Sequence, residues 1–271
     1  MTTTPYALFM GDFNVGKSSL INALLRRETL VVSRRETRAV ATYVSRGTSD
    51  EPFYGGWKES SSTIETLGHE EYLGIRLDAN PKGYGALSAR LPDLPFSRLA
   101  LVDTVGMSSE IKASVRINAL DDVSQALMVV VTDIEYWSAK HTMQFIQHHR
   151  ALLGDSLIVV ANKADHLNAS EIQRLCDKAA QRLEGFGIKP APRFFAVSAR
   201  LEAARGQQGN EYRQRTKRDV RDRCDAGMDA LRVALYEFEA RHAAGVPADA
   251  AGVLNAPVSR SFLKAFEGAG S

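Results

Sequence analysis

The fold of this chain is decided by the stretch Gly11-Asp12-Phe13-Asn14-Val15-Gly16-Lys17-Ser18. The stretch has the form GxxxxGK[ST], follows a short apolar run at 6–10, and precedes residues 19–25, whose apolar side chains recur at helical spacing. Its glycines let backbone N–H groups turn inward around phosphate oxygens, Lys17 supplies a positive charge, and the Ser18 hydroxyl can ligate Mg²⁺. A strand, a loop and a helix in this order predict a site for a nucleoside triphosphate, with phosphate contacts from Gly11, Asp12, Phe13, Asn14, Val15, Gly16, Lys17, Ser18 and Ser19.

A second motif, Asn162-Lys163-Ala164-Asp165, follows the apolar run 157–161 and predicts that the base is guanine. A carboxylate at the Asp165 position accepts two hydrogen bonds, from the ring N–H and the exocyclic amine of guanine. Adenine lacks this pair of donors on that edge. A buried polar group of this kind discriminates by about 10⁴ or more, because the wrong base leaves it unpaired. We therefore expect Asn162, Lys163 and Asp165 to form the base site.

Two further motifs complete the pattern. Asp103-Thr104-Val105-Gly106 follows the run 99–102 and has the DxxG form that senses Mg²⁺ and the γ-phosphate. Val197-Ser198-Ala199 follows the run 193–196 and is expected to complete the base pocket, although by itself it is a strand end followed by a helix cap. Each motif alone is a weak signal, since GxxxxGKS can be a surface loop and DxxG is a common turn. Four motifs in this order, each at the end of a predicted strand, indicate one nucleotide site.

The composition is that of a folded protein with a sizeable core, at 271 residues and 44% hydrophobic content. A net charge of +2 gives no strong electrostatic argument for nucleic acid or membrane. Cys176 and Cys224 lack metal or disulfide spacing, which is typical of a reducing compartment, and the histidines show no zinc spacing. No run approaches the roughly 20 apolar residues of a membrane span. Because the first strand also begins too early for a signal peptide, we expect a cytoplasmic protein.

Alternating strand and helix patterns predict an α/β fold with a mostly parallel central sheet and helices on both faces. With the four motifs in this order, the chain resembles a Ras-like P-loop GTPase domain. The interval between the first motif and DxxG is long for a minimal domain of this kind, so we expect an insertion at about 48–96, between the first switch and the DxxG strand. The domain is expected to cover 1–241, with a closing helix at about 225–241. Residues 242–271, rich in Ala, Gly and Pro, are expected to be a linker or tail.

Other helices are predicted from periodicity and caps. Residues 138–153 have a helical pattern, and Ser170 is expected to begin another helix through a capping box with Gln173. The segment 200–223 is rich in Lys and Arg. It is interpreted as a solvated helical face, with a surface that contacts lipid or RNA phosphates as the alternative.

With the four motifs placed, the chain resembles the translation-factor-related GTPases and, within them, the bacterial dynamin-like GTPase domains. The resemblance covers about residues 5–241 and is carried by 11–25, a threonine-rich first switch at 36–42, the approach to DxxG at 91–103, and 225–231. It implies hydrolysis of GTP to GDP and phosphate, a nucleotide-dependent homodimer that acts as an assembly switch, a helical partner protein that supplies the stalk, and a peripheral place at a membrane surface.

The resemblance also implies roles for residues on the phosphate side. Lys17 holds the β and γ phosphates, Ser18 and Thr37 ligate Mg²⁺, and Gly106 senses the γ-phosphate through its N–H. Asp103 holds the ion through water. Lys17, Thr37 and Gly106, together with Asn14, are thus the candidate catalytic residues, while Thr42 is interpreted as an ordinary strand residue.

On the base side, the resemblance implies that Asn162 ties the base loop to the phosphate loop, Lys163 covers the guanine face, and the Ala199 N–H faces the guanine oxygen.

Met107 follows the DxxG glycine, where Ras-like enzymes have a water-orienting glutamine, so another group must stabilise charge. Related GTPases without that glutamine often dimerise and use K⁺ held partly by an asparagine at the Asn14 position; on turn chemistry alone, Asn14 can equally stabilise the loop. Assistance in cis from Arg34, Arg35 or Arg38 is a further alternative.

Two other functions stay open from the sequence. The stretch 14–22 and the Thr37-Arg38 pair also suit the GTPases of ribosome assembly and tRNA modification, which makes RNA a second, less favoured partner. The third alternative is a nucleotide-gated binding protein with little turnover.

Overall fold

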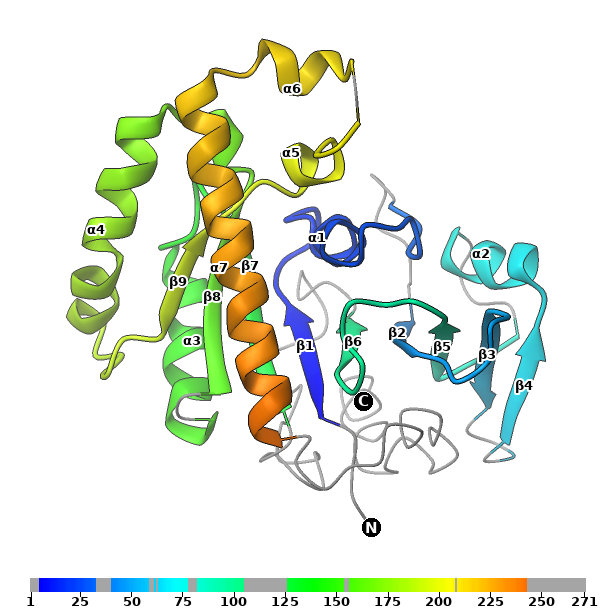
Figure 1. The fold of residues 1–271 in the computed structure, drawn as a ribbon. Helices are drawn as coiled ribbons and strands as arrows, with labels where there is room; N and C mark the ends of the chain where they lie inside the picture. The colour runs from blue at the N-terminus through cyan, green and yellow to red at the C-terminus, as the bar shows by residue number, and fades with distance from the viewer. Residues whose placement is uncertain are drawn as a thin grey trace.

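One central sheet organises the molecule (Figure 1). The computed structural model describes residues 5–32, 40–58, 61, 63–77, 82–104, 126–153, 156–207 and 209–242. Within them, nine strands pair in the order β4-β3-β5-β2-β6-β1-β7-β8-β9. Their bounds are β1 Tyr6–Met10, β2 Ala41–Arg46, β3 Phe53–Lys58, β4 Thr63–Leu67, β5 Ala86–Leu91, β6 Ala100–Asp103, β7 Ala126–Asp133, β8 Leu157–Asn162 and β9 Arg193–Ala196.

The half of the sheet that carries the motifs is parallel. β1 pairs in parallel with β6 on one side and β7 on the other, and β7, β8 and β9 continue in parallel. Because parallel strands end at the same edge, the phosphate loop after β1, Asp103 at the end of β6, and the base motif after β8 come together there. The predicted mostly parallel α/β sheet is confirmed.

The segment between β2 and β6 widens the sheet. β2 is antiparallel to β6 and parallel to β5, while β3 pairs antiparallel with both β5 and β4. The helix α2, His69–Leu77, packs beside β3. The ring centroids of its Tyr72 and of Tyr54 lie 4.8 Å apart; Tyr72 and Trp57 are buried, and the partly buried Tyr54 packs against the core. The chain expected to be an insertion therefore adds strands to one edge of the central sheet.

Helices cover both faces of the sheet, as predicted. Along β1, Ala7 and Phe9 face one core, whereas Leu8 and Met10 face the other. Helices α1 and α2 and most of α7 pack into the first core, whereas α3, α4 and the first turns of α7 pack into the second. The helix bounds are α1 Lys17–Leu25, α3 Lys140–Leu153, α4 Ala169–Gly185, α5 Ala199–Ala203, α6 Glu211–Arg215 and α7 Arg218–His242, with a short 3₁₀ helix, η4, at Ala164–His166.

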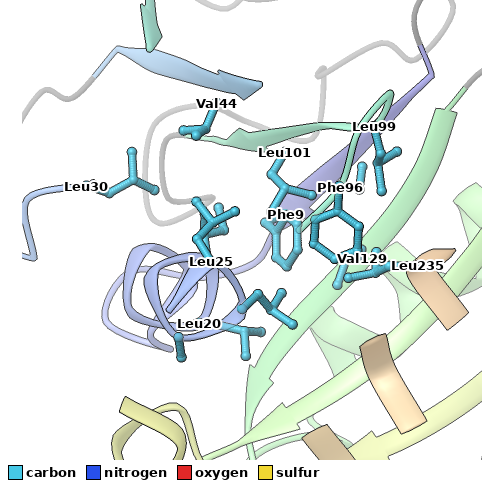
Figure 2. Close-up of a cluster of buried hydrophobic side chains, with 14 of the residues drawn as sticks. Phe9, Leu20, Leu25, Leu30, Val44, Phe96, Leu99, Leu101, Val129 and Leu235 are labelled. Carbon is cyan, nitrogen blue, oxygen red and sulfur yellow. The ribbon is translucent and has the colours of Figure 1, made fainter. Parts of the chain in front are cut away.

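The core beneath α1 holds in place the two elements that flank the phosphate loop, β1 and α1. Figure 2 shows side chains from β1, β6 and α1 gathered in the space between the helix and the strands, among them Phe9, Leu101, Leu20 and Leu25. Each of these residues is buried, and removing a large apolar side chain from water contributes roughly 1.5–3 kcal/mol. The loop is thus anchored at both ends by packed elements.

The closing helix differs from its expected start. α7 begins at Arg218 rather than near Asp225, because Val220 and Cys224 are buried and extend its apolar stripe toward the N-terminus. At its other end, the buried Glu239 accepts hydrogen bonds from two backbone N–H groups just before β6. In the described part of the chain, neither this helix nor any other is long and apolar enough to cross a membrane.

Two other helix starts also correct the predictions. The N-cap of α4 is Asn168, whose side chain accepts the Glu171 N–H at 2.9 Å while the Glu171 carboxylate accepts the Asn168 N–H at 3.0 Å. The box expected between Ser170 and Gln173 is therefore wrong by two positions, because Asn168 is the residue with the extended backbone that an N-cap requires. Helix α3 starts at Lys140 rather than at 138, after a turn.

Candidate nucleotide-binding site

The phosphate loop runs from the carboxyl end of β1 into α1. At the N-cap of α1, Gly16 has a φ of 90°, and a Cβ there would lie 2.4 Å from the side-chain nitrogen of Asn162, so this position requires glycine. The Lys17 Nζ donates to the carbonyl oxygens of Gly11 and Asp12, each at 2.9 Å. The lysine is buried, so its charge is confined to the loop beside the N-terminus of α1, where backbone N–H groups favour an anion.

The other residues of the loop differ in exposure. Val15 is buried in the core under α1, and Phe13 and Ser19 are half-buried. Asn14 is exposed and has a left-handed backbone, with a φ of 61°. This conformation is one that asparagine tolerates better than most residues, so the turn interpretation of Asn14 has local support. Its exposed side chain also leaves the cation interpretation open.

Ser18 and Asp103 meet beside the phosphate loop. The Ser18 hydroxyl donates to Oδ2 of Asp103 at 2.6 Å, and Asp103 is 1% exposed at the end of β6. A hydroxyl beside a buried carboxylate offers the hard oxygen donors that Mg²⁺ prefers, so these residues fit the expected ion. No group of three or more His, Cys, Asp or Glu side chains that could hold a metal occurs within the described ranges.

Asn162, the last residue of β8, joins the phosphate loop to the segment 197–199, here called the base loop. Its Nδ2 donates to the carbonyl oxygen of Val15 at 2.9 Å, and its Oδ1 accepts the N–H of Ala199 at 3.0 Å. Ser198 caps α5 by accepting the N–H of Leu201. The Ala199 N–H is thus engaged with Asn162 in this structure, and its contact with a guanine oxygen stays a prediction that requires the N–H to be shared.

Lys163 and Asp165 follow β8, with Lys163 at the N-cap of η4 and Asp165 within it. Lys163 has a left-handed backbone, and its Nζ lies 2.8 Å from Oδ2 of Asp133 at the end of β7. Asp165, in η4, accepts a hydrogen bond from the Tyr212 hydroxyl of α6. The Arg200 guanidinium stacks on the Tyr212 ring at 3.4 Å from its centroid. Burial, and then the contact with Asp165, raise the pKa of Tyr212 to about 12.

Sequence reasoning missed two contacts at this site. One is the hydrogen bond from Tyr212 to Asp165, and the other joins His141 of α3 to Asp12 of the phosphate loop, Nε2 to Oδ2, at 2.7 Å. Neither Tyr212 nor His141 belongs to a motif, and no periodic pattern connects them to their partners. Only the packing of α3 and α6 beside the strand ends brings these side chains to the site.

Several predicted residues lie outside the described residues. These are Thr37 and Gly106 of the two switches, Met107, and the arginines considered for assistance in cis, Arg34, Arg35 and Arg38. Thr42 is described: it is buried in β2, and its hydroxyl donates to the Val40 carbonyl, as befits an ordinary strand residue.

The basic segment 200–223 is largely engaged within the protein. Arg205 donates to both carboxylate oxygens of Asp229, at 2.7 and 3.1 Å, and this contact raises the pKa of Arg205 and lowers that of Asp229. Arg213 pairs in the same two-pronged manner with Asp225. These internal partners favour the interpretation as a solvated helical face, and contact with an acidic partner stays a prediction.

The geometry agrees with a comparison of the sequence with known families. A sequence model described as 50S ribosome-binding GTPase matches residues 6–163, more than half of the chain. The chain belongs to this family. Members of such P-loop families are GTPases, the class of enzymes that bind and hydrolyse GTP. The match ends before Asp165, so it does not test the assignment of Asp165, Ser198 and Ala199 to the base.

Solved structures extend the likeness in fold. Two structures of an oligomerised bacterial dynamin pair, described as a mechanism for long-range sensing and tethering of membranes, match with a TM-score of 0.63 each. The identities are 17% and 16%, over 94% and 99% of this chain and 42% and 40% of those chains. The chain thus spans about four tenths of their length. Era in complex with MgGDPNP and 16S ribosomal RNA matches at a TM-score of 0.40 and 19% identity, over 73% of this chain and 52% of that chain. No curated protein sequence matches this one.

Proposed function

We propose that this GTPase holds GTP across the carboxyl edge of its sheet, with the phosphates on loop 11–19 and the guanine on Asp165. The observation that carries this proposal is the position of Asn162, which hydrogen-bonds both to the phosphate loop and to the base loop. One side chain therefore couples the two halves of the site. The buried Lys17 supports the phosphate end, because a confined positive charge interacts strongly with phosphate.

In this proposal, hydrolysis relies on positioning and charge. Lys17 and the N–H groups of the loop bind the β and γ phosphates, and the Gly106 N–H binds the γ-phosphate. Ser18, Asp103 and Thr37 would hold Mg²⁺. The bound ion would neutralise charge on the phosphates in a loose transition state. Measuring the affinity of the protein for GTP and for ATP tests the base site. Equal affinities for the two nucleotides would contradict the proposed role of Asp165.

We also propose that the protein acts as a dynamin-like, nucleotide-dependent assembly switch at a membrane surface, with a helical partner supplying the stalk. The support is that the bacterial dynamin pair shares this fold over nearly the whole chain, including the part beyond residue 163. Those proteins are described as oligomerised and as tethering membranes. GTP hydrolysis measured with and without anionic liposomes tests the membrane part, and stimulation by liposomes is expected.

Dimer-dependent, K⁺-assisted turnover is the catalytic form of this proposal. The test measures GTP hydrolysis in KCl and in NaCl at matched ionic strength over a range of protein concentration. We expect the specific activity to be higher in KCl and to rise with concentration. Asn14→Gly is the informative variant, because glycine keeps the left-handed turn while removing the side chain. Loss of the K⁺ response in this variant supports a cation ligand, whereas an unchanged response assigns Asn14 to the turn alone.

A second candidate is a GTPase that acts on the ribosome or on RNA. It is favoured by the family description, 50S ribosome-binding GTPase, over residues 6–163. Stimulation of hydrolysis by total RNA or ribosomal subunits, with no response to liposomes, would select it. Single turnover without multiple cycles under every condition would select the third candidate, a nucleotide-gated binding protein.

A further inference from the structure

Helix α6 reaches the base motif through the side chain of Tyr212. Its hydroxyl donates to Oδ2 of Asp165, and the two residues are 47 positions apart in the chain. We propose that Tyr212 is a positioning residue that orients the Asp165 carboxylate and thereby sets the preference of the site for a base carrying the 2-amino group. This inference rests on the proposed function, in which Asp165 binds guanine.

The position of Tyr212 is fixed from several sides. On the ring face, the Arg200 guanidinium lies 3.4 Å from the ring centroid, and this arginine is part of α5, directly after the base loop. The next residue on α6, Arg213, donates two hydrogen bonds to the carboxylate of Asp225 on α7 and one to the carbonyl of Leu201 at 3.0 Å. Helix α6 is thereby tied to both α5 and α7, which holds Tyr212 in place beside Asp165.

Whether Tyr212 orients Asp165 or competes with the base for it depends on how many hydrogen bonds the Asp165 carboxylate can accept. A carboxylate has two oxygens and about four acceptor sites, and guanine uses one site on each oxygen. The Tyr212 hydroxyl can therefore stay bound to Oδ2 as a third donor. Because burial raises the pKa of Tyr212 to about 12, the hydroxyl keeps its proton and donates at neutral pH.

Asp165 needs such a partner because its own torsion does not fix the carboxylate plane. The final torsion of an aspartate is broad and roughly two-fold, so rotamer preference leaves the orientation of the two oxygens loosely determined. Guanine requires both oxygens in one plane with its edge. Inosine, which keeps the ring N–H but lacks the 2-amine, requires only one oxygen and is less sensitive to that plane.

The test is Tyr212→Phe, which removes only the hydroxyl, with GDP, IDP and ADP binding measured. A hydrogen bond to a charged group is worth about 1.5–3 kcal/mol, and part of this loss appears in binding, so we expect GDP affinity to fall roughly 10-fold and IDP affinity roughly 2-fold. The GDP to IDP ratio therefore falls about 5-fold. A merely structural role would weaken both nucleotides equally. Tyr236→Phe, on α7, is the matched control and should leave the ratio unchanged.

The outcomes separate this inference from the proposed function. If the native protein binds ADP as well as GDP, the guanine site itself is refuted. If the native protein discriminates but Tyr212→Phe keeps the GDP to IDP ratio, or binds GDP more tightly, the orienting role is refuted. If Tyr212→Phe does not unfold cooperatively, Arg213→Lys is measured in its place. This variant keeps the positive charge but weakens the contacts of Arg213 with Asp225 and Leu201, which hold α6 in position. The same fall in the ratio is then expected, and an unchanged ratio overturns the inference.

Discussion

Replacing Asn162 by alanine tests whether one amide holds the two halves of the nucleotide site together. Asn162 is 3% exposed and makes two hydrogen bonds, to the Val15 carbonyl at 2.9 Å and from the Ala199 N–H at 3.0 Å. Asn162→Ala leaves both backbone groups in a region that water enters poorly. The variant therefore loses two hydrogen bonds and leaves two buried polar groups without their partner.

The expected loss follows from those two groups. A buried donor or acceptor left unsatisfied costs about 1–3 kcal/mol, so the free energy of unfolding without nucleotide should fall by about 2–4 kcal/mol, allowing for partial relaxation. For a domain of this size, that corresponds to a Tm lower by about 5–15 °C. GDP affinity should fall as well, because the phosphate and base loops are no longer held at a fixed separation.

The assay is urea unfolding followed by circular dichroism without nucleotide, then GDP titration of the folded variant. Asn22→Ala is the matched control: Asn22 also bridges two segments, through hydrogen bonds with Thr29 and Leu30, but not the two loops of the site. It should lose comparable stability and much less GDP affinity. The reasoning is refuted if Asn162→Ala unfolds at the native urea midpoint, or if both variants lose GDP affinity equally.

Three further substitutions test the site and its support. Asp165→Asn should lose affinity for GTP and gain affinity for xanthosine triphosphate, because the base of the latter has a carbonyl in place of the amine and accepts a hydrogen bond from the asparagine amide. Unchanged GTP binding in competition assays would contradict this. Lys17→Ala should abolish thermal stabilisation by GTP, while Lys58→Ala, on β3, should keep it; retained stabilisation in the first variant would be decisive against the role of Lys17. Gly227→Ala should destabilise the protein by about 1–3 kcal/mol, because the new Cβ would lie 2.0 Å from the Ala196 carbonyl oxygen. The control Gly74→Ala, on α2, adds a Cβ that meets nothing within 4 Å and should be neutral or stabilising. Equal unfolding midpoints for the two variants would refute the close approach.

The sequence by itself determined where the site lies. The GxxxxGK[ST] loop, the DxxG aspartate and the base motif each follow an apolar run, and apolar runs of that length become buried parallel strands whose carboxyl ends share one edge. The meeting of Ser18 with Asp103, 85 residues away, follows from this rule without any knowledge of the intervening chain. Local chemistry was enough, because these motifs are short and the backbone conformation of each is set by its own residues.

Only the tertiary structure decided how the rest of the chain surrounds the site. Gly227 in the middle of α7 is locally unfavourable by about 1 kcal/mol, and its reason is visible only where the helix passes the carbonyl of Ala196. The order of β5, β3 and β4 beyond β2, and the contacts of Tyr212 and His141 with the loops, also had no local signal. Such contacts join residues far apart in the chain, and they form because helices and strands must bury their apolar faces against one another, which no short stretch of sequence specifies alone.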